Sequence, residues 1–283
     1  MKEFKGKVAV VTGAASGIGR GLADACAREE MKIVLADVDE AALGETGREL
    51  KDAGADVLAV RTDVSKAEDV EALAQRTLEA FGAVHLLFNN AGVGAGTTVW
   101  ESTLADWQWV LGVNLWGVIH GVRTFIPLML EQGDECHVVN TSSAAGLISG
   151  PALGVYKASK HAVVSLSETL YCELAIIKAK IGVSVLCPGG VNTRMLDSAR
   201  NRPAELQNDS TRESTHPAVV QADAMLRELV EAGIRPSQVA DMVFDAVREG
   251  RFYVLTHDDW KPLVRQRMND ILLGRNPNWF NPQ

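Results

Sequence analysis

Tyr156 and Lys160 are the residues whose types and spacing most directly suggest acid–base chemistry. They lie four positions apart in the stretch 153–174, whose pattern predicts a helix, so their side chains would share one helix face. Free tyrosine titrates near pH ~10 and is a poor base at neutrality, but a nearby positive charge lowers the pKa of a phenol. The pair could therefore exchange a proton with an alcohol or a carbonyl oxygen.

Hydroxyl groups lie upstream of this pair. The run Asn140-Thr141-Ser142-Ser143 ends a strand-like segment and stands about thirteen residues before Tyr156. Its hydroxyls could polarise the same substrate oxygen. The alternative is a surface tyrosine–lysine pair on an amphipathic helix, because YxxxK alone is a short and common pattern. The segments before and after it favour the catalytic interpretation.

The elements that must position these residues alternate between strand-like and helical segments. Continuous apolar runs are typical of strands buried on both faces, and repeated strand–helix units predict a parallel, doubly wound α/β sheet. At 283 residues the chain can bury one large core. We predict strands at residues 7–12, 32–37, 56–60, 84–88, 136–140, 183–187 and 252–255.

Capping residues predict three helix starts. Asp39 can cap the helix after the second strand, and Ser65 with Glu68 forms the S-x-x-E pattern of a capping box. Thr103 opens a long helix, in which residues 107–122 carry no charge. That stretch is shorter than the ~20 apolar residues of a membrane span, so we predict a buried or interface helix.

Three glycines follow the first strand. Gly13, Gly17 and Gly19 lie between residues 7–12 and a helical pattern, which is the context of a dinucleotide-binding loop. Such glycines allow a tight turn and a close approach of the main chain to a pyrophosphate, which the N–H groups of the following helix can bind. The spacing is GxxxGxG rather than GxGxxG, which points to a particular branch of this fold.

Composition and charge exclude several classes of partner. The formal net charge of −8 argues against nucleic acid and against an anionic membrane surface. The four cysteines show no CxxC spacing and the six histidines show no metal-ligand spacing. We therefore expect reduced thiols, no metal and a cytoplasmic location. No secretory h-region precedes the first glycines.

In its ordered motifs the chain resembles the short-chain dehydrogenase/reductase family over about residues 5–195. The resemblance implies a single Rossmann-type domain with a seven-stranded parallel sheet, assembled as a homodimer or homotetramer. It also implies a nicotinamide cofactor and hydride transfer between a small-molecule alcohol and a ketone. The motifs are Thr12-Gly13-Ala-Ala-Ser-Gly17-Ile-Gly19, Asn89-Asn90-Ala91-Gly92, Asn114, Ser143, Tyr156-x-x-x-Lys160 and Pro188-Gly189.

The resemblance also implies roles for individual residues. Tyr156 would be the acid/base and Lys160 its partner; Ser143, with Ser142 as the weaker candidate, would stabilise charge on the substrate oxygen. Asn114 would hold a water in a proton relay. Residues 63–64 would contact the adenine, and the segment after Pro188-Gly189 the nicotinamide carboxamide. The implied cofactor-binding residues are Gly13, Ser16, Gly17, Ile18, Gly19, Asp37, Asp63, Val64, Asn90, Ala91, Gly92, Tyr156, Lys160, Pro188, Gly189, Val191 and Thr193.

Asp37 indicates which nicotinamide cofactor is preferred. It ends the second strand 24 residues after Gly13, near the ~20-residue offset at which an acidic side chain reaches the adenosine ribose. Its carboxylate could bind the ribose hydroxyls of NAD and would repel the 2′-phosphate of NADP. We expect the nearest cation, Arg20, to face away, and we predict NAD over NADP. Alternatively Asp37 only caps the next helix, which Asp39 can also do.

Two classes of function remain open. The first is an NAD(P)-dependent alcohol dehydrogenase or ketone reductase, with reduction of 3-oxoacyl chains as a variant that Asp37 and the C-terminal extension 256–283 weaken. The second is a non-catalytic cofactor-sensing protein on the same fold, which need not keep the acid–base pair. The tail after about residue 201 is similar to that of bacterial family members that act on bulky aromatic or lipophilic secondary alcohols.

The segment 197–217 is polar and interrupts the alternation of elements. Long loops in compact domains are often lids, so we predict a substrate-loop region at 190–235 that closes over the substrate. The arginines of this region could bind an anion, but the interspersed acidic residues favour a solvated loop. The arginines are Arg194, Arg200, Arg202 and Arg212.

The long helix after Thr103 and the residues just before it carry clustered tryptophans and glycines. We expect the aromatic side chains in the core or in subunit contacts, and the glycines to permit close packing at an oligomer interface. These residues are Trp100, Trp107, Trp109 and Trp116, with Gly112, Gly117 and Gly121.

Overall fold

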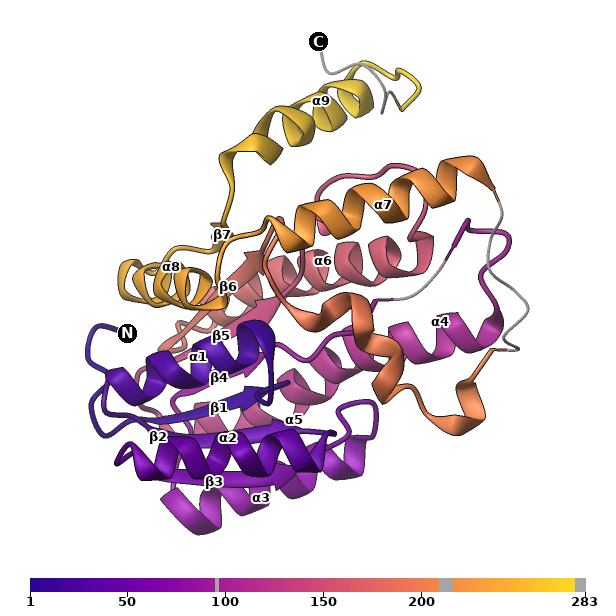
Figure 1. Ribbon diagram of the computed structural model, residues 1–283. Helices are drawn as coiled ribbons and strands as arrows, with labels where there is room; N and C mark the ends of the chain where they lie inside the picture. Colours follow the sequence, from indigo (N-terminus) through magenta and orange to yellow (C-terminus); the bar gives the residue numbers. More distant parts are fainter. Residues whose placement is uncertain (95–96, 209–215, 278–283) are drawn as a thin grey trace.

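The computed structural model describes residues 1–94, 97–208 and 216–277. A seven-stranded parallel sheet in the order β3-β2-β1-β4-β5-β6-β7 lies at its centre, with helices on both faces (Figure 1). The predicted doubly wound, single-domain fold is confirmed, with strand ends displaced by at most two residues. The strands are β1 Val8–Thr12, β2 Lys32–Asp37, β3 Val57–Arg61, β4 Leu86–Asn89, β5 Cys136–Thr141, β6 Ile181–Cys187 and β7 Tyr253–Leu255.

Alternate residues of the inner strands face two separate cores. In β1, Ala9 and Val11 belong to one core, whereas Val8 and Val10 belong to the other. Successive side chains of a strand point to opposite faces, so both sets must be apolar where both faces are covered. The continuous apolar runs in the sequence follow directly from this double burial.

Helices close each core. The strand order reverses at β1, which pairs with both β2 and β4, so the carboxyl ends of these strands open a crevice of the kind that binds ligands in such sheets. On the first core lie α1 Gly17–Arg28, α2 Glu40–Asp52 and α8 Pro236–Glu249, and on the second α3 Ala67–Phe81, α5 Gly117–Gln132 and α6 Gly154–Ile176.

The helix predicted from Thr103 is present but not uniform. α4 Leu104–Leu111 begins with a capping box formed by Thr103 and Asp106, and a π-helical turn at Gly112–Trp116 joins it to α5. Among the described residues this is the one helix long and apolar enough to cross a membrane. Its second half packs on the sheet as a core helix.

The capping box predicted at Ser65 is wrong. α3 begins at Ala67, and its N-cap Lys66 makes no side-chain capping hydrogen bond. The Ser65 hydroxyl donates to Asp63 Oδ1 at 2.7 Å instead. Serine hydroxyls close local turns as readily as they cap helices, and the neighbouring aspartate decides between the two here.

The segment predicted as an irregular loop contains 3₁₀ turns, at Arg194–Asn201 and Ala204–Leu206, before α7 Pro217–Glu231. Such short turns need no apolar stripe, so the sequence pattern did not reveal them. After β7, residues Asp258–Trp260 lead into α9 Lys261–Leu272, which stands apart from the helix layers (Figure 1). Arg212 and the end of the chain from residue 278 lie outside the described residues.

Gly117 and Gly121 of the long helix pack against their own chain, whereas the predicted role of its glycines at an oligomer interface stays a prediction. A Cβ atom added at Gly121 would lie 2.0 Å from Asn89 Oδ1, and one at Gly117 would lie 2.8 Å from Val64 Cγ2. These glycines let the helix approach the ends of β4 and of the loop after β3. They thereby position this helix against the sheet and the cavity wall.

We predict that Gly121→Ala destabilises the fold by about 1–3 kcal/mol, the usual cost of overpacking a tight core. Asn89 cannot easily move, because its side chain is buried and donates to Asn140 Oδ1 at 2.9 Å. Gly44→Ala in α2 is the matched control: its Cβ would meet nothing closer than the Arg48 guanidinium at 3.8 Å. Alanine there should stabilise by roughly 0.5–1 kcal/mol through helix propensity. Urea unfolding measures both, and equal effects would contradict the assignment.

Candidate active site

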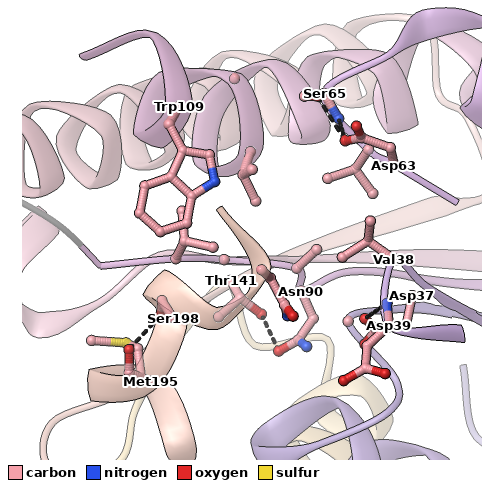
Figure 2. A pocket seen from close by; sticks show the side chains of 18 of the residues that line it. Asp37, Val38, Asp39, Asp63, Ser65, Asn90, Trp109, Thr141, Met195 and Ser198 are labelled. Carbon is pink, nitrogen blue, oxygen red and sulfur yellow. Dashed lines mark hydrogen bonds between the residues drawn. The ribbon is translucent and has the colours of Figure 1, made fainter. Parts of the chain in front are cut away.

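A cavity of about 740 Å³ opens at the carboxyl ends of the strands, where a doubly wound sheet binds its ligands. Figure 2 shows residues from both of its ends, with Asn90 and Thr141 between them. One end carries Asp37, Val38, Asp39, Asp63 and Ser65, and the other carries Trp109, Met195 and Ser198. The cavity is therefore one continuous space with a mainly acidic end and an apolar end.

The glycine loop brings the main chain to the edge of this cavity. Gly13 has a φ of +66°, and a Cβ atom at Gly19 would lie 1.9 Å from Gly13 O. Only glycine fits that contact, so α1 can begin directly against the end of β1. Its first turn lines the cavity, and the free N–H groups of a helix N-terminus bind phosphate. A pyrophosphate fits this cradle.

Asp37 lies at the acidic end and is held by main-chain donors. Its carboxylate accepts from Ala15 N at 3.0 Å and from Asp39 N at 3.1 Å. Burial raises the pKa of Asp37, and these N–H groups lower it in part. Asp39 caps α2 by accepting from Ala42 N, so capping does not require Asp37. Arg20 pairs with Asp24 and Glu49, as expected for a cation that faces away.

A row of hydrogen bonds, here called the strand-end network, joins Thr12, Asn90, Thr141 and Lys160. The Thr12 hydroxyl accepts from Asn90 N at 2.9 Å, and the Asn90 amide donates back to Thr12 O at 3.0 Å. Asn90 Oδ1 accepts from the Thr141 hydroxyl at 3.3 Å, and Lys160 Nζ donates to Thr141 O at 3.0 Å. The network links the glycine loop to the predicted catalytic lysine.

Tyr156 and Lys160 share one face of α6, as predicted, and both are buried. Lys160 Nζ lies 5.6 Å from the centre of the Tyr156 ring. The expected fall in the pKa of Tyr156 is not found: burial raises it, and the hydrogen bond with Ser143 opposes that rise only in part. Burial also lowers the pKa of Lys160, to about 8. Desolvation is the largest cause of the pKa shift of both groups.

The two candidate serines differ in what they contact. The Ser143 hydroxyl accepts from Ala145 N at 3.1 Å and hydrogen-bonds Tyr156. The Ser142 hydroxyl donates to Lys160 O at 2.8 Å and is buried. Ser143 is therefore the serine beside the phenol, in agreement with the order of preference from the sequence.

Asn114 lies in the π-helical turn and is fully buried. Its Oδ1 accepts from Val93 N at 2.8 Å, and its Nδ2 donates to Val93 O and to Ser159 Oγ. A Cβ at Gly92 would lie 3.5 Å from both Asn114 Oδ1 and Lys160 Nζ. The Asn114 side chain thus supports the loop after β4, beside Lys160.

Tryptophans form part of the cavity wall, which the sequence did not reveal. Trp107, Trp109 and Trp116 line the cavity, whereas Trp100 is 77% exposed. Trp109 packs with Val93 and Val155, the latter being the neighbour of Tyr156. Their spacing along the helix is equally compatible with core packing, so the sequence alone does not show that they face the cavity.

Arg202 is not part of a solvated loop, contrary to the expectation. Its side chain is 7% exposed and pairs with Asp106, which is 4% exposed, at 2.7 Å. Its guanidinium lies 5.0 Å from the centre of the Trp109 ring. Burial alone would raise the pKa of Asp106, but hydrogen bonds from Thr103, Arg202 and Asn208 lower it. This contact fixes the segment after β6 to the start of α4.

Most residues assigned to the cofactor from the sequence line the cavity. The exceptions are Gly19, which packs on Gly13, Gly189, whose Cβ would meet Trp260 and His257, and Val191, which is buried in the first core. Ser143 and Asn114 also lie behind the lining. The lining members are Gly13, Ser16, Gly17, Ile18, Asp37, Asp63, Val64, Asn90, Ala91, Gly92, Tyr156, Lys160, Pro188 and Thr193.

Comparison with known proteins identifies the class. Residues 7–204 match the family model described as short chain dehydrogenase. The chain belongs to the short-chain dehydrogenase/reductase family of oxidoreductases, as its motifs had indicated.

Individual relatives match nearly the whole chain. The chain is 34% identical over 278 residues to the "CLA biosynthesis dehydrogenase/reductase" of Lactiplantibacillus plantarum, which covers 98% of this chain and 97% of the relative. It is 30% identical over 284 residues to the "C alpha-dehydrogenase" of Sphingobium, covering 100% and 91%. It also matches the crystal structure of a short-chain dehydrogenase/reductase from Burkholderia phymatum in complex with NAD. The TM-score is 0.95, with 53% identity and 98% coverage of both chains.

We predict that Arg202→Met frees the segment 194–206. The change leaves the Asp106 carboxylate without its partner, and breaking a buried pair in this way costs up to about 3–5 kcal/mol. Hydrogen exchange should show faster exchange of these amides while the strands of the sheet stay protected. Arg227→Met is the matched control, because Arg227 pairs with Asp223 at a site where both side chains are more than half exposed. Equal exchange in the two variants would contradict the anchoring role.

Proposed function

We propose that the protein is an NAD-dependent oxidoreductase that interconverts a secondary alcohol and a ketone by hydride transfer. The observation that carries the proposal is that Tyr156 and Lys160 line the cavity that the glycine loop also borders, with Ser143 behind the lining beside the Tyr156 phenol. Family membership supports the oxidoreductase class.

In this proposal Tyr156 moves the proton. Its phenolate takes the hydroxyl proton of the alcohol, and in the reverse direction its hydroxyl gives a proton to the carbonyl oxygen. The Lys160 ammonium favours the phenolate, while burial works against it. The Ser143 hydroxyl stabilises charge on the substrate oxygen, and Asn114 supports a water in the proton path.

The cavity fits a nicotinamide dinucleotide. The cradle at Gly13 and the start of α1 would hold the pyrophosphate, Asp37 the adenosine ribose, residues 63–64 the adenine, and Thr193 the carboxamide. When bound, this cofactor accepts or supplies the hydride. The solved relative from Burkholderia phymatum, in complex with NAD, supports this choice.

The substrate we propose is a bulky aromatic or lipophilic secondary alcohol. The apolar end of the cavity supports it, because Trp107, Trp109 and Leu206 offer flat and aliphatic surface. The segment 194–206, which lies within the predicted substrate-loop region 190–235, would cover the substrate and keep water from it. Two alternatives are reduction of 3-oxoacyl chains and a non-catalytic cofactor sensor; the acid–base set beside the cavity argues against the sensor.

We also propose a homodimer or homotetramer. Large apolar side chains that stay exposed on the long helix support such an assembly; they include Leu104, Trp116 and Leu130.

The test of the proposed function is a panel of secondary alcohols supplied with NAD⁺, followed by the absorbance of NADH. We predict that Tyr156→Phe lowers kcat by roughly 10²–10⁴, the usual contribution of general acid–base catalysis, while NAD⁺ still binds. Tyr171→Phe is the control, since Tyr171 lies on the exposed side of the same helix and packs on Phe252. A Tyr156→Phe enzyme as fast as wild type would refute the assignment.

Cofactor choice gives a separate prediction. Wild type should use NAD with a kcat/KM one to three powers of ten above that for NADP, about 1.4 kcal/mol for each. Asp37→Ala should erode the ratio mainly by weakening NAD binding. Asp39→Ala should remove the α2 cap and cost about 1 kcal/mol of stability while the ratio persists. If both variants change the ratio of NAD to NADP use equally, Asp37 affects cofactor choice only through the conformation of the turn before α2.

A further inference from the structure

Met195 lies against the group that must bind the substrate oxygen. The Tyr156 hydroxyl donates to Met195 Sδ at 3.8 Å. A thioether sulfur is a weak acceptor, so a carbonyl or alcohol oxygen would replace it at the phenol. The thioether therefore occupies part of the space in which the reacting carbon and its substituents must fit.

The main chain at Met195 is held in place. The Ser198 hydroxyl donates to Met195 O and accepts from Gly94 N at 3.2 Å, and Figure 2 shows the first of these bonds beside the Met195 sulfur. Arg202 anchors the same segment to Asp106 at 2.7 Å. Adjustment to a substrate must therefore come from the side chain of Met195, which has three rotatable bonds.

The apolar end of the cavity is lined unequally. The Met195 methyl group covers Gly94, where an added Cβ would lie 3.6 Å from Met195 Cε. Trp109 packs beside Val155, and Trp107 and Leu206 line the same end of the cavity. A substituent of the reacting carbon that points toward Met195 meets a filled space, whereas one that points toward the tryptophans meets an apolar wall.

We propose that Met195 determines substrate specificity by limiting one substituent of the carbinol carbon to about the size of a methyl group. The other substituent can be large, flat and apolar, and packs on the tryptophan wall. The substrate class is then an alcohol of the aryl- or alkyl-methyl carbinol type and its methyl ketone. This inference rests on the proposed function of the same site.

The test compares two ketones that differ only in the small substituent, acetophenone and isobutyrophenone. Both are titrated calorimetrically into the full-length protein saturated with NAD⁺, which cannot reduce them, so binding is measured without turnover. Wild type should bind acetophenone at least tenfold more tightly. Met195→Ala should bring the ratio of the two dissociation constants down at least tenfold.

Met195→Leu is the matched control, because it keeps the volume and removes the sulfur, and its ratio should stay within threefold of wild type. The affinity for NAD⁺ should be the same in all three forms. An unchanged ratio in Met195→Ala, or no binding of either ketone by wild type, overturns the inference. Failure of the proposed function is a different result: wild type then produces no NADH from any alcohol of the panel, while the binding ratios still decide the role of Met195.

Discussion

The site depends on the strand-end network. Parallel strands present their last polar groups at one edge of the sheet, where no further strand residue pairs with them, and buried polar groups of this kind need partners. Thr12, Asn90 and Thr141 satisfy one another across β1, β4 and β5, and Lys160 completes the row from α6. Because each member hydrogen-bonds its neighbour, the glycine loop and Lys160 are held in one fixed relation. A shift of one strand would separate them.

The two ends of the cavity are built by different means. At the acidic end, main-chain groups and glycines form much of the surface, and their positions follow from the register of β1 and β2. At the apolar end, side chains of α4 and of the segment after β6 form the wall. They come from distant parts of the chain and meet through one buried ion pair, Arg202 with Asp106. The first end is common to the fold, whereas the second can change with a few side chains.

This difference explains what could be predicted from the sequence. The strands, the glycine loop and the shared face of Tyr156 and Lys160 follow from local patterns that hold wherever the fold occurs. The burial of Arg202 and the placement of Trp109 depend on a contact between residues about a hundred positions apart, which no local pattern encodes. The prediction of a lowered pKa for Tyr156 was wrong for a similar reason. The i,i+4 spacing indicates that Lys160 is near, but it does not show the loss of water around both groups, which raises the pKa of Tyr156.

The π-helical turn at Gly112–Trp116 sets the rotation of everything that follows it in the long helix. An α-helix turns about 100° per residue, so the extra residue of a π turn shifts the phase of α5 by that angle. With this phase Gly117 faces Val64 and Gly121 faces Asn89. Deleting one residue to make this turn α-helical would rotate α5 and place side chains larger than glycine against Val64 and Asn89. The number of residues in this turn therefore determines both the cavity wall and the packing of α5 on the sheet.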